Sequence, residues 1–484
     1  MATSDLLYRC SSIRTALIES GLFSSHPATA EVSGVRATSD GDGNSWRIGV
    51  KPFALPPDQL SFFRELGSHL LAFYASLNRL YYESARGTQP AWVAGYLDQG
   101  KPEGLISYGR MKRFRDELPA VIRPDVIPTS DGMVITELDS VPGGIGLTAC
   151  LTKLYREAEA GLRFEAGLDG MVRGFAAMLS HHKGERPGCV AIVVSEEAKD
   201  YRPEMTWMAA RLSEQGLQSA CVEPRQIRFT EKGLRMHQGD REVPVALVYR
   251  FYELFDLPNI PKAELIQYAA KKDMVAVTPP FKPALEEKSA FALLHHPALQ
   301  PFWRKELGAD RYLHLTALMP RTWILDPAPI PPSATIPGLS LGSRVVMQWK
   351  DLAAATQKER HFVIKPSGFS ELAWGSRGVS VGHDMPQQDW AAAIDQALQS
   401  FPRTPYILQE FHKGRQYQVE YFDPATGDVK EMSGRARLSP YYFVTGERAE
   451  LAGILATICP ADKKVIHGMK DAVMVPCAVT PEVR

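Results

Sequence analysis

Three acidic residues, Asp125, Glu137 and Asp139, lie close together in the stretch Val121–Cys150. The stretch alternates polar and apolar residues on either side of Ser130-Asp131-Gly132. Asp and Gly tolerate the positive φ of a tight turn, so two short antiparallel strands are predicted. With the turn centred there, Asp125 and Glu137 lie almost opposite each other, with Cβ atoms roughly 5 Å apart. Carboxylates this close repel each other unless a cation lies between them, and an all-oxygen site suits Mg²⁺.

The alternation also places Arg123 on the same face as Asp125. A solvated surface hairpin with scattered acids is the alternative explanation, and this stretch alone favours it because short motifs recur by chance. Residues 140–146 are glycine-rich and precede a helix predicted over residues 147–160. Such glycines let backbone N–H groups approach an anion at a helix N-terminus, and a tight strand-to-helix turn without a ligand explains them equally well.

A second group of candidate residues lies far along the chain. Residues 361–366 read as a strand that ends with Lys365 and Pro366, and a long loop rich in Gly and Ser follows it. A lysine there supplies charge for a phosphate and the loop supplies backbone N–H donors, so Gly368, Ser376 and Gly378 are predicted to contact a nucleotide. The loop is not a Walker A loop, because no Gly-Lys-Ser/Thr ends it.

The next predicted strand ends in Gln409, Glu410 and Phe411, whose backbone groups are placed to meet an adenine edge. A later strand over residues 430–438 carries Arg437. Each piece alone also fits half of an ordinary antiparallel hairpin. Their order along the chain favours a nucleotide site.

The composition excludes several classes of protein. The chain has 484 residues, 45% of them hydrophobic, and its 55 Lys and Arg balance its 55 Asp and Glu, so nothing in the charge indicates nucleic acid or an anionic membrane as a partner. The six cysteines are scattered without a Cys-x-x-Cys pair, which fits a reducing compartment and gives no zinc signature. No apolar run approaches the roughly 18 residues of a membrane span, and no signal peptide is evident. A cytoplasmic protein is expected.

An α/β (α+β) fold with three parts is predicted: residues 1–180, a small α/β subdomain at 186–275, and residues 276–484. Within the second part, residues 189–195 and 245–250 are continuous apolar runs, as in buried parallel strands. Helical and strand patterns alternate between them, which is typical of a parallel sheet. No Gly-x-Gly-x-x-Gly follows the first strand, so a dinucleotide site is not predicted.

Two helices and a loop region complete the expectations. Residues 1–50 are polar and rich in turn residues, and a loop is expected at 38–45. Residues 56–83 carry apolar side chains at helical spacing. Residues 286–294 are expected to begin a helix that carries Lys288.

The pieces around Lys365, Gln409 and Arg437 resemble, in their order, the nucleotide half of an ATP-grasp ligase. In most ATP-grasp enzymes the metal motif, an Asp and then Glu-x-Asn, comes after these pieces. Here Asp125 and Glu137-Leu-Asp139 come before them. That inverted order resembles the circularly permuted ATP-grasp proteins of the glutathionylspermidine synthase-like group.

The same group carries Arg-x-Asp, with Glu-x-Asn beginning twelve residues after the Asp. Arg123-Pro-Asp125 and Glu137 keep that spacing. Lys288 is similar to the first ATP lysine of the group, and Lys365 to the second. Two departures matter: Asp139 stands where the group has Asn, and the run Val141–Gly144 replaces a Thr-rich segment. No Cys/His amidase domain is present, so spermidine and glutathione are not carried over as substrates.

The resemblance implies a permuted ATP-grasp core and ATP- and Mg²⁺-dependent joining of a small-molecule or peptide carboxylate to an amine. It implies that the three acids hold Mg²⁺, that Lys288 and Lys365 bind phosphates, and that Arg123 and Arg437 stabilise the transferring phosphoryl group. Two alternatives stay open: a nucleotide-binding module without ligase activity, and a phosphotransferase acting on a hydroxyl.

Overall fold

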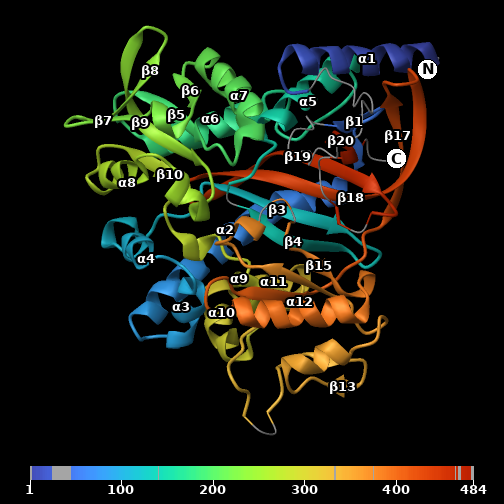
Figure 1. Cartoon of the computed structure of the whole chain (residues 1–484). Coiled ribbons are helices and arrows are strands. Elements are labelled where there is room, and N and C mark those ends of the chain that lie inside the picture. Colours follow the sequence, from blue (N-terminus) through green and yellow to red (C-terminus); the bar gives the residue numbers. More distant parts are fainter. Residues whose placement is uncertain are drawn as a thin grey trace, which may run out of the picture.

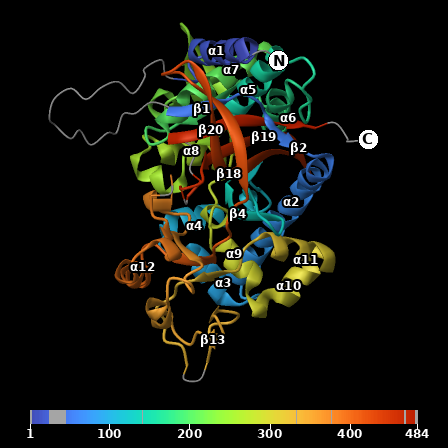
Figure 2. The same ribbon diagram turned by 90° about the vertical axis from the view of Figure 1, so that its right-hand side faces the viewer.

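The computed structural model of the chain describes residues 3–23, 45–139, 141–331, 334–373, 375, 377–463, 465–466 and 470–480. Within these residues the fold is α+β, with one large sheet, two smaller sheets and a short hairpin. The large sheet crosses the middle of the molecule, the six-stranded sheet with its helices lies on one side, and the four-stranded sheet with α12 lies on the other (Figure 1; Figure 2). The predicted α+β class is therefore confirmed.

The large sheet combines strands from both ends of the chain. Its order is β17-β1-β20-β19-β18-β3-β4, and β2 pairs with β20. Because β17 pairs with both β1 and β18, five of these strands form a closed ring. The strands are β1 (Ser45–Gly49), β2 (Phe53–Leu55), β3 (Val121–Pro128), β4 (Met133–Asp139), β17 (Gln416–Asp423), β18 (Asp428–Thr445), β19 (Arg448–Pro460) and β20 (Lys470–Val479).

The long helix α2 (Pro57–Ala85) packs on this sheet. The Tyr442 hydroxyl donates to the Phe63 carbonyl oxygen at 2.6 Å. A Cβ at Gly67 would lie 2.6 Å from the Ala449 carbonyl oxygen, so only glycine permits this approach of helix to strand. The helix predicted over residues 56–83 is confirmed.

The six-stranded sheet has the order β6-β5-β9-β8-β7, and β10 pairs with β9. Its strands β5, β6, β9 and β10 are parallel to one another, and the buried strands predicted at 189–195 and 245–250 are confirmed. The strands are β5 (Cys189–Val194), β6 (Ser219–Val222), β7 (Arg228–Thr230), β8 (Gly233–Gln238), β9 (Arg241–Phe251) and β10 (Ala276–Thr278). The helices packed around it are α6 (Gly170–Lys183), α7 (Arg202–Glu214) and α8 (Ala263–Lys271).

The four-stranded sheet is antiparallel, with the order β11-β16-β14-β15. One face packs against α12 (Gln387–Ser400), whose Trp390 and Ile394 are fully buried. The other face carries Lys365 and Gln409. The strands are β11 (Thr322–Ile324), β14 (Phe362–Pro366), β15 (Ser380–Val381) and β16 (Tyr406–Glu410), with the hairpin β12 (Ser340–Leu341) and β13 (Arg344–Val345) nearby in the sequence.

The turn-rich start of the chain also contains a helix, α1 (Thr3–Glu19), because Cys10, Ile13 and Leu17 recur at helical spacing and are buried. One expectation about a helix is wrong: the helix expected from residue 286 begins four residues later, at Ala290, so Lys288 lies in the turn before it. The loop expected at 38–45 falls almost wholly outside the described residues.

The remaining helices are α3 (Ala91–Asp98), α4 (Glu103–Gly109), α5 (Ile145–Ala158), α9 (Ala290–His295), α10 (Gln300–Leu307) and α11 (Ala309–Leu318). No helix in the described ranges is both long enough and apolar enough to cross a bilayer.

Candidate active site

The hairpin β3–β4 has the predicted register. Asp125 lies opposite Glu137, and Arg123 lies opposite Asp139. The register shifts between Asp125 and Val126, so the strand bulges where the acids cluster. The hairpin therefore brings the three predicted acids together at the edge of the large sheet.

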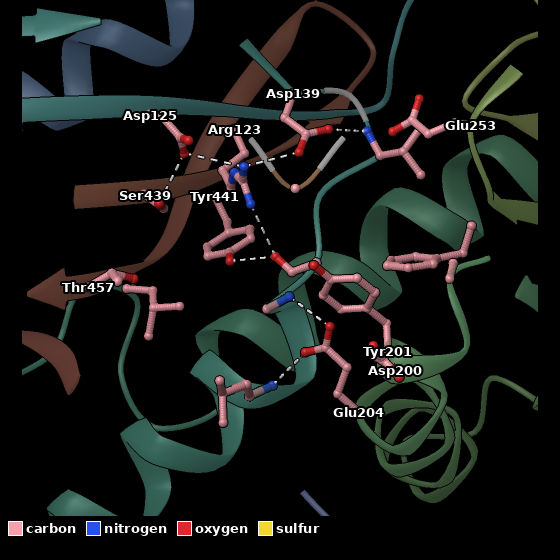
Figure 3. Close-up of a pocket in the computed structure, with 18 of the residues that line it drawn as sticks. Arg123, Asp125, Asp139, Asp200, Tyr201, Glu204, Glu253, Ser439, Tyr441 and Thr457 are labelled. Atoms are coloured by element: carbon pink, nitrogen blue, oxygen red, sulfur yellow. Dashed lines mark hydrogen bonds and ion pairs between the residues drawn. The ribbon is translucent and has the colours of Figure 1, made fainter. Parts of the chain in front are cut away.

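A buried guanidinium links two of the acids. Arg123 pairs with Asp125 at 3.2 Å and with Asp139 at 3.0 Å. Figure 3 shows these contacts, together with Ser439, whose hydroxyl donates to Asp125 at 3.2 Å. Arg437 adds a second cation, 3.0 Å from Asp125. Burial opposes ionisation of Asp125, but Arg123 and Arg437 outweigh it and hold the pKa of this carboxyl below its usual range.

The third acid, Glu137, pairs with Lys288 at 2.9 Å. The Lys288 ammonium also donates to the Ala373 carbonyl oxygen at 2.9 Å. Burial disfavours the charge on Lys288, but Glu137 raises the pKa of this lysine above its usual value. All three acids therefore have a cationic partner from the protein.

This arrangement bears on the predicted metal site. In the part of the chain that the structure describes, no three His, Cys, Asp or Glu side chains are grouped closely enough to hold a metal ion. The donors nevertheless fit Mg²⁺ in type, because Asp125, Glu137 and Asp139 offer only oxygen. Burial and the neighbouring Glu137 raise the pKa of Asp139 above its usual value, so negative charge is crowded here and an added cation would relieve it. The metal site stays a prediction, and it requires Arg123 and Lys288 to release their carboxylates.

The predicted strand lysine reaches the hairpin. The Lys365 ammonium on β14 donates to the Gln409 amide oxygen at 2.9 Å and to the Thr136 carbonyl oxygen at 3.3 Å. Burial, together with the nearby charge of Lys288, lowers the pKa of Lys365 to about 8. The two lysines thus approach β4 from separate segments of the chain.

The end of β16 is more occupied than expected. The Gln409 amide nitrogen donates to the Thr322 hydroxyl at 3.2 Å. The backbone N–H groups of Glu410 and Phe411 donate to the carbonyl oxygens of Arg321 and His361, both at 2.9 Å. These two donors are therefore engaged within the protein and are not available for an adenine edge in this arrangement.

The loop after β14 is anchored at both ends. A Cβ at Gly368 would lie 2.1 Å from the Glu286 carbonyl oxygen, and a Cβ at Gly378 would lie 2.9 Å from the Leu372 carbonyl oxygen. Both glycines are needed for close packing, and the Gly378 N–H already donates to Leu372 at 3.0 Å. The predicted contact at Ser376 lies outside the described residues.

A buried ion pair holds the start of this loop. Lys101 lies 2.5 Å from Glu287, and both side chains are essentially inaccessible to solvent. Glu287 also accepts a hydrogen bond from the Ser367 hydroxyl. The turn before α4, the segment before α9 and the glycine-rich loop therefore meet at one buried carboxylate.

In the described part of the glycine run, residues 141–146, a protein carboxylate already occupies the start of α5. The Glu204 carboxylate accepts the N–H groups of Gly144 at 2.7 Å and Leu147 at 3.0 Å (Figure 3). Burial raises the pKa of Glu204 to about 7, although the backbone donors oppose the shift. A Cβ at Gly143 would lie 2.0 Å from the Tyr201 ring. Of the two explanations left open, the tight turn without a ligand is the one this geometry supports.

A cavity of about 200 Å³ lies beside the hairpin. One wall carries Arg123, Asp139 and Arg437, and the glycine-rich loop contributes Ala373 and Gly375. The opposite wall consists of residues that follow β5 and β9, at the carboxyl ends of parallel strands, where ligands of α/β sheets commonly bind. The residues in the cavity that the sequence interpretation missed are Glu197, Asp200, Tyr201, Glu253, Asp256, Ser439, Tyr441 and Thr457.

Comparison with known proteins identifies a similar fold. The chain resembles a glutathione synthetase-like effector from Globodera pallida, solved in its apo form, with a TM-score of 0.55 and 12% sequence identity, over 99% of this chain and 98% of that one. A second structure, named "Putative gamma-glutamylcysteine synthetase" from Methylobacillus flagellatus KT, matches with a TM-score of 0.39 and 10% identity over 82% of this chain and 85% of its own. No family model and no curated protein matches the chain. The first likeness shows a synthetase-like fold, and the second adds no argument.

Proposed function

We propose that this protein is an ATP- and Mg²⁺-dependent carboxylate–amine ligase that forms an amide or peptide bond through an acyl phosphate. The observation that carries the proposal is the meeting of two basic segments with one acidic hairpin. Lys288 contacts Glu137 at 2.9 Å, and Lys365 contacts the Thr136 carbonyl oxygen at 3.3 Å. Lysines from two separate segments beside three carboxylates are what a site for a metal-bound polyphosphate requires.

The finer assignment is a circularly permuted ATP-grasp core like that of the glutathionylspermidine synthase-like group. The order of the segments supports it, because the acidic hairpin precedes both lysines in the chain and yet lies beside them in space. The synthetase-like fold is compatible with it.

Binding of Mg-ATP would exchange partners in the site. Asp125, Glu137 and Asp139 would hold the metal, and Lys288 and Lys365 would turn to the phosphates. When bound, ATP supplies the phosphoryl group that is transferred, and Mg²⁺ offsets part of the negative charge of the phosphates. In the free protein each of these carboxylates pairs with a protein cation. Metal alone would leave those cations without partners, and nucleotide alone would leave the carboxylates without partners. Metal and nucleotide should therefore bind with positive coupling.

The chain's own contribution to the reaction would be positioning and charge stabilisation. Arg123 and Arg437 would stabilise the transferring phosphoryl group and hold the substrate carboxylate beside it. A carboxylate oxygen of the acid would bond to the γ-phosphorus. The bond between the γ-phosphorus and the oxygen that bridges it to the β-phosphate would break at the same time, and ADP would be released. The amine nitrogen then attacks the acyl carbon, phosphate leaves with the former carboxylate oxygen, and the ammonium proton passes to solvent.

Hydroxylamine tests the proposal without knowledge of the natural amine. Incubation with Mg-ATP, hydroxylamine and a panel of carboxylic acids should yield a hydroxamate and ADP in equal amounts. ADP formed with alcohols and without hydroxamate would indicate a phosphotransferase instead. Binding of Mg-ATP without turnover across the panel would indicate a nucleotide-binding module.

A further inference from the structure

The floor of the cavity is a row of side chains that crosses neighbouring strands of the large sheet. Arg437 on β18 lies opposite Thr457 on β19, and Thr457 lies opposite Met474 on β20. Ser439 lies opposite Leu455 in the next row. Residues directly opposite each other point to the same face of a sheet, so all five face the cavity that they line.

This row changes character in one direction. It begins at Arg437 beside Asp125, continues with the hydroxyl of Thr457 and ends at Met474, while the hydroxyl of Ser439 lies beside Arg437 in the next row. Beyond Met474 the cavity is lined by Trp46 on β1 and by Leu22 after α1, and both of these side chains are buried. A ligand whose carboxylate lies at the arginines therefore extends over hydroxyls toward an apolar end.

Thr457 carries an unused hydrogen-bonding group. Its side chain is fully buried, and its hydroxyl oxygen has no hydrogen-bond partner among the described residues. Buried hydroxyls in folded proteins are nearly always paired. Figure 3 shows Thr457 at the cavity beside the strand that carries Ser439. A ligand group that hydrogen-bonds here would supply the partner that this hydroxyl lacks.

The facing wall disfavours a second negative charge on the ligand. Asp200, Glu253 and Asp256 all line it. A carboxylate added there would be repelled by the acids that are ionised.

We propose that the acid substrate is a small monocarboxylic acid with an apolar body and one hydrogen-bonding group, and that Thr457 determines this preference. This inference rests on the ligase function proposed above. The substrate carboxylate lies at Arg123 and Arg437, its polar group meets Thr457, and its apolar end contacts Leu455 and Met474. The cavity of about 200 Å³ limits the acid to a small molecule.

Calorimetric titration of acids into protein saturated with Mg²⁺ and a non-hydrolysable ATP analogue tests the preference independently of turnover. Two pairs of similar shape differ in a second carboxylate: 4-methylpentanoate against glutarate, and leucine against glutamate. We expect the apolar member of each pair to bind at least about tenfold more tightly, since mispaired buried polar groups cost more than that. Equal or tighter binding of glutarate and glutamate would overturn the proposal.

Thr457→Val keeps the shape of the side chain and removes the hydroxyl. The wild type should bind at least one monohydroxylated 4-methylpentanoate about tenfold more tightly than the parent acid. Thr457→Val should lose that ratio while it still binds the parent acid, and Thr457→Ser should retain it. Thr152→Val removes a buried hydroxyl that is bonded to Thr148 away from this cavity, and it serves as the control for folding.

An unchanged ratio in Thr457→Val, or no preference for any hydroxylated acid, would refute the role of Thr457. Failure of the ligase function would appear separately, as absence of hydroxamate from acids that nevertheless bind with the predicted preference. The two results are distinguishable because one is measured as affinity and the other as product.

Discussion

The buried pair Lys101–Glu287 offers a perturbation whose size follows from the structure. The two side chains are 2.5 Å apart and almost wholly inaccessible to solvent. Lys101→Met leaves the Glu287 carboxylate buried without its counter-charge. Removing one partner of such a pair typically lowers the free energy of unfolding by about 3–5 kcal/mol.

The double variant Lys101→Met with Glu287→Gln should recover most of that loss. The glutamine is uncharged, and its amide oxygen still accepts the Ser367 hydroxyl that Glu287 accepts now. Replacing both members of a buried ion pair by uncharged side chains of similar volume is often nearly neutral for stability. The single variant should therefore be less stable than the double variant by about 2–4 kcal/mol.

Guanidinium unfolding of the four proteins in this cycle, followed by tryptophan fluorescence, measures the coupling directly. A single variant as stable as the wild type, or a double variant as unstable as the single one, would refute the reasoning about this pair.

Three further predictions concern the nucleotide side of the site. Burial lowers the pKa of Lys365 to about 8, so above pH 8 this side chain is neutral in the free protein. Because phosphate binding requires the charged form, binding must then take up a proton. The Kd for Mg-ATP should therefore rise by up to about tenfold per pH unit above pH 8. Lys365→Arg keeps its charge and should remove that slope in titrations from pH 7 to 9.5. Glu137→Gln loses a partly exposed pair with Lys288, so it should lower the free energy of unfolding by less than about 1 kcal/mol. The same substitution should abolish the enhancement of ATP binding by Mg²⁺. Unchanged enhancement would place the metal elsewhere. Hydrogen exchange across residues 367–378 should slow on addition of Mg-ATP, and equal rates with and without it would mark the loop as a fixed structural element.

Local features of the site were predictable from the sequence because they depend on residues close together in the chain. The turn at Ser130-Asp131-Gly132 and the alternation around it fix which acids oppose each other, and Asp125 and Glu137 are opposed as expected. The strand that ends beside Lys365 follows from its own apolar run. In both cases hydrogen bonding between neighbouring segments, rather than distant contacts, decides the arrangement.

Long-range partners were not predictable in the same way. Alternation placed Arg123 beside Asp125, but no local pattern indicated that Lys288, which is remote in sequence, would pair with Glu137. Likewise, the N-terminus of α5 is capped by Glu204, which lies 60 positions from Gly144. No local pattern indicates which distant carboxylate fills a helix N-terminus.

The unpaired hydroxyl of Thr457 was also invisible in the sequence. Its significance depends on the register of β18 and β19, which places it opposite Arg437, and on the absence of a hydrogen-bond partner within the described residues. An alternating strand pattern alone predicts neither the register of the strands nor whether a hydroxyl finds a hydrogen-bond partner.

The measurement that tests the central claim most directly is the fate of a labelled carboxylate oxygen. An acid labelled with ¹⁸O in its carboxylate, incubated with the protein, Mg-ATP and hydroxylamine, should transfer one ¹⁸O to each inorganic phosphate released with ADP. Phosphate analysed by mass spectrometry would carry that label only if the carboxylate oxygen had bonded to the γ-phosphorus. Hydroxamate formed together with unlabelled phosphate, or release of AMP in place of ADP, would contradict activation of the acid as an acyl phosphate.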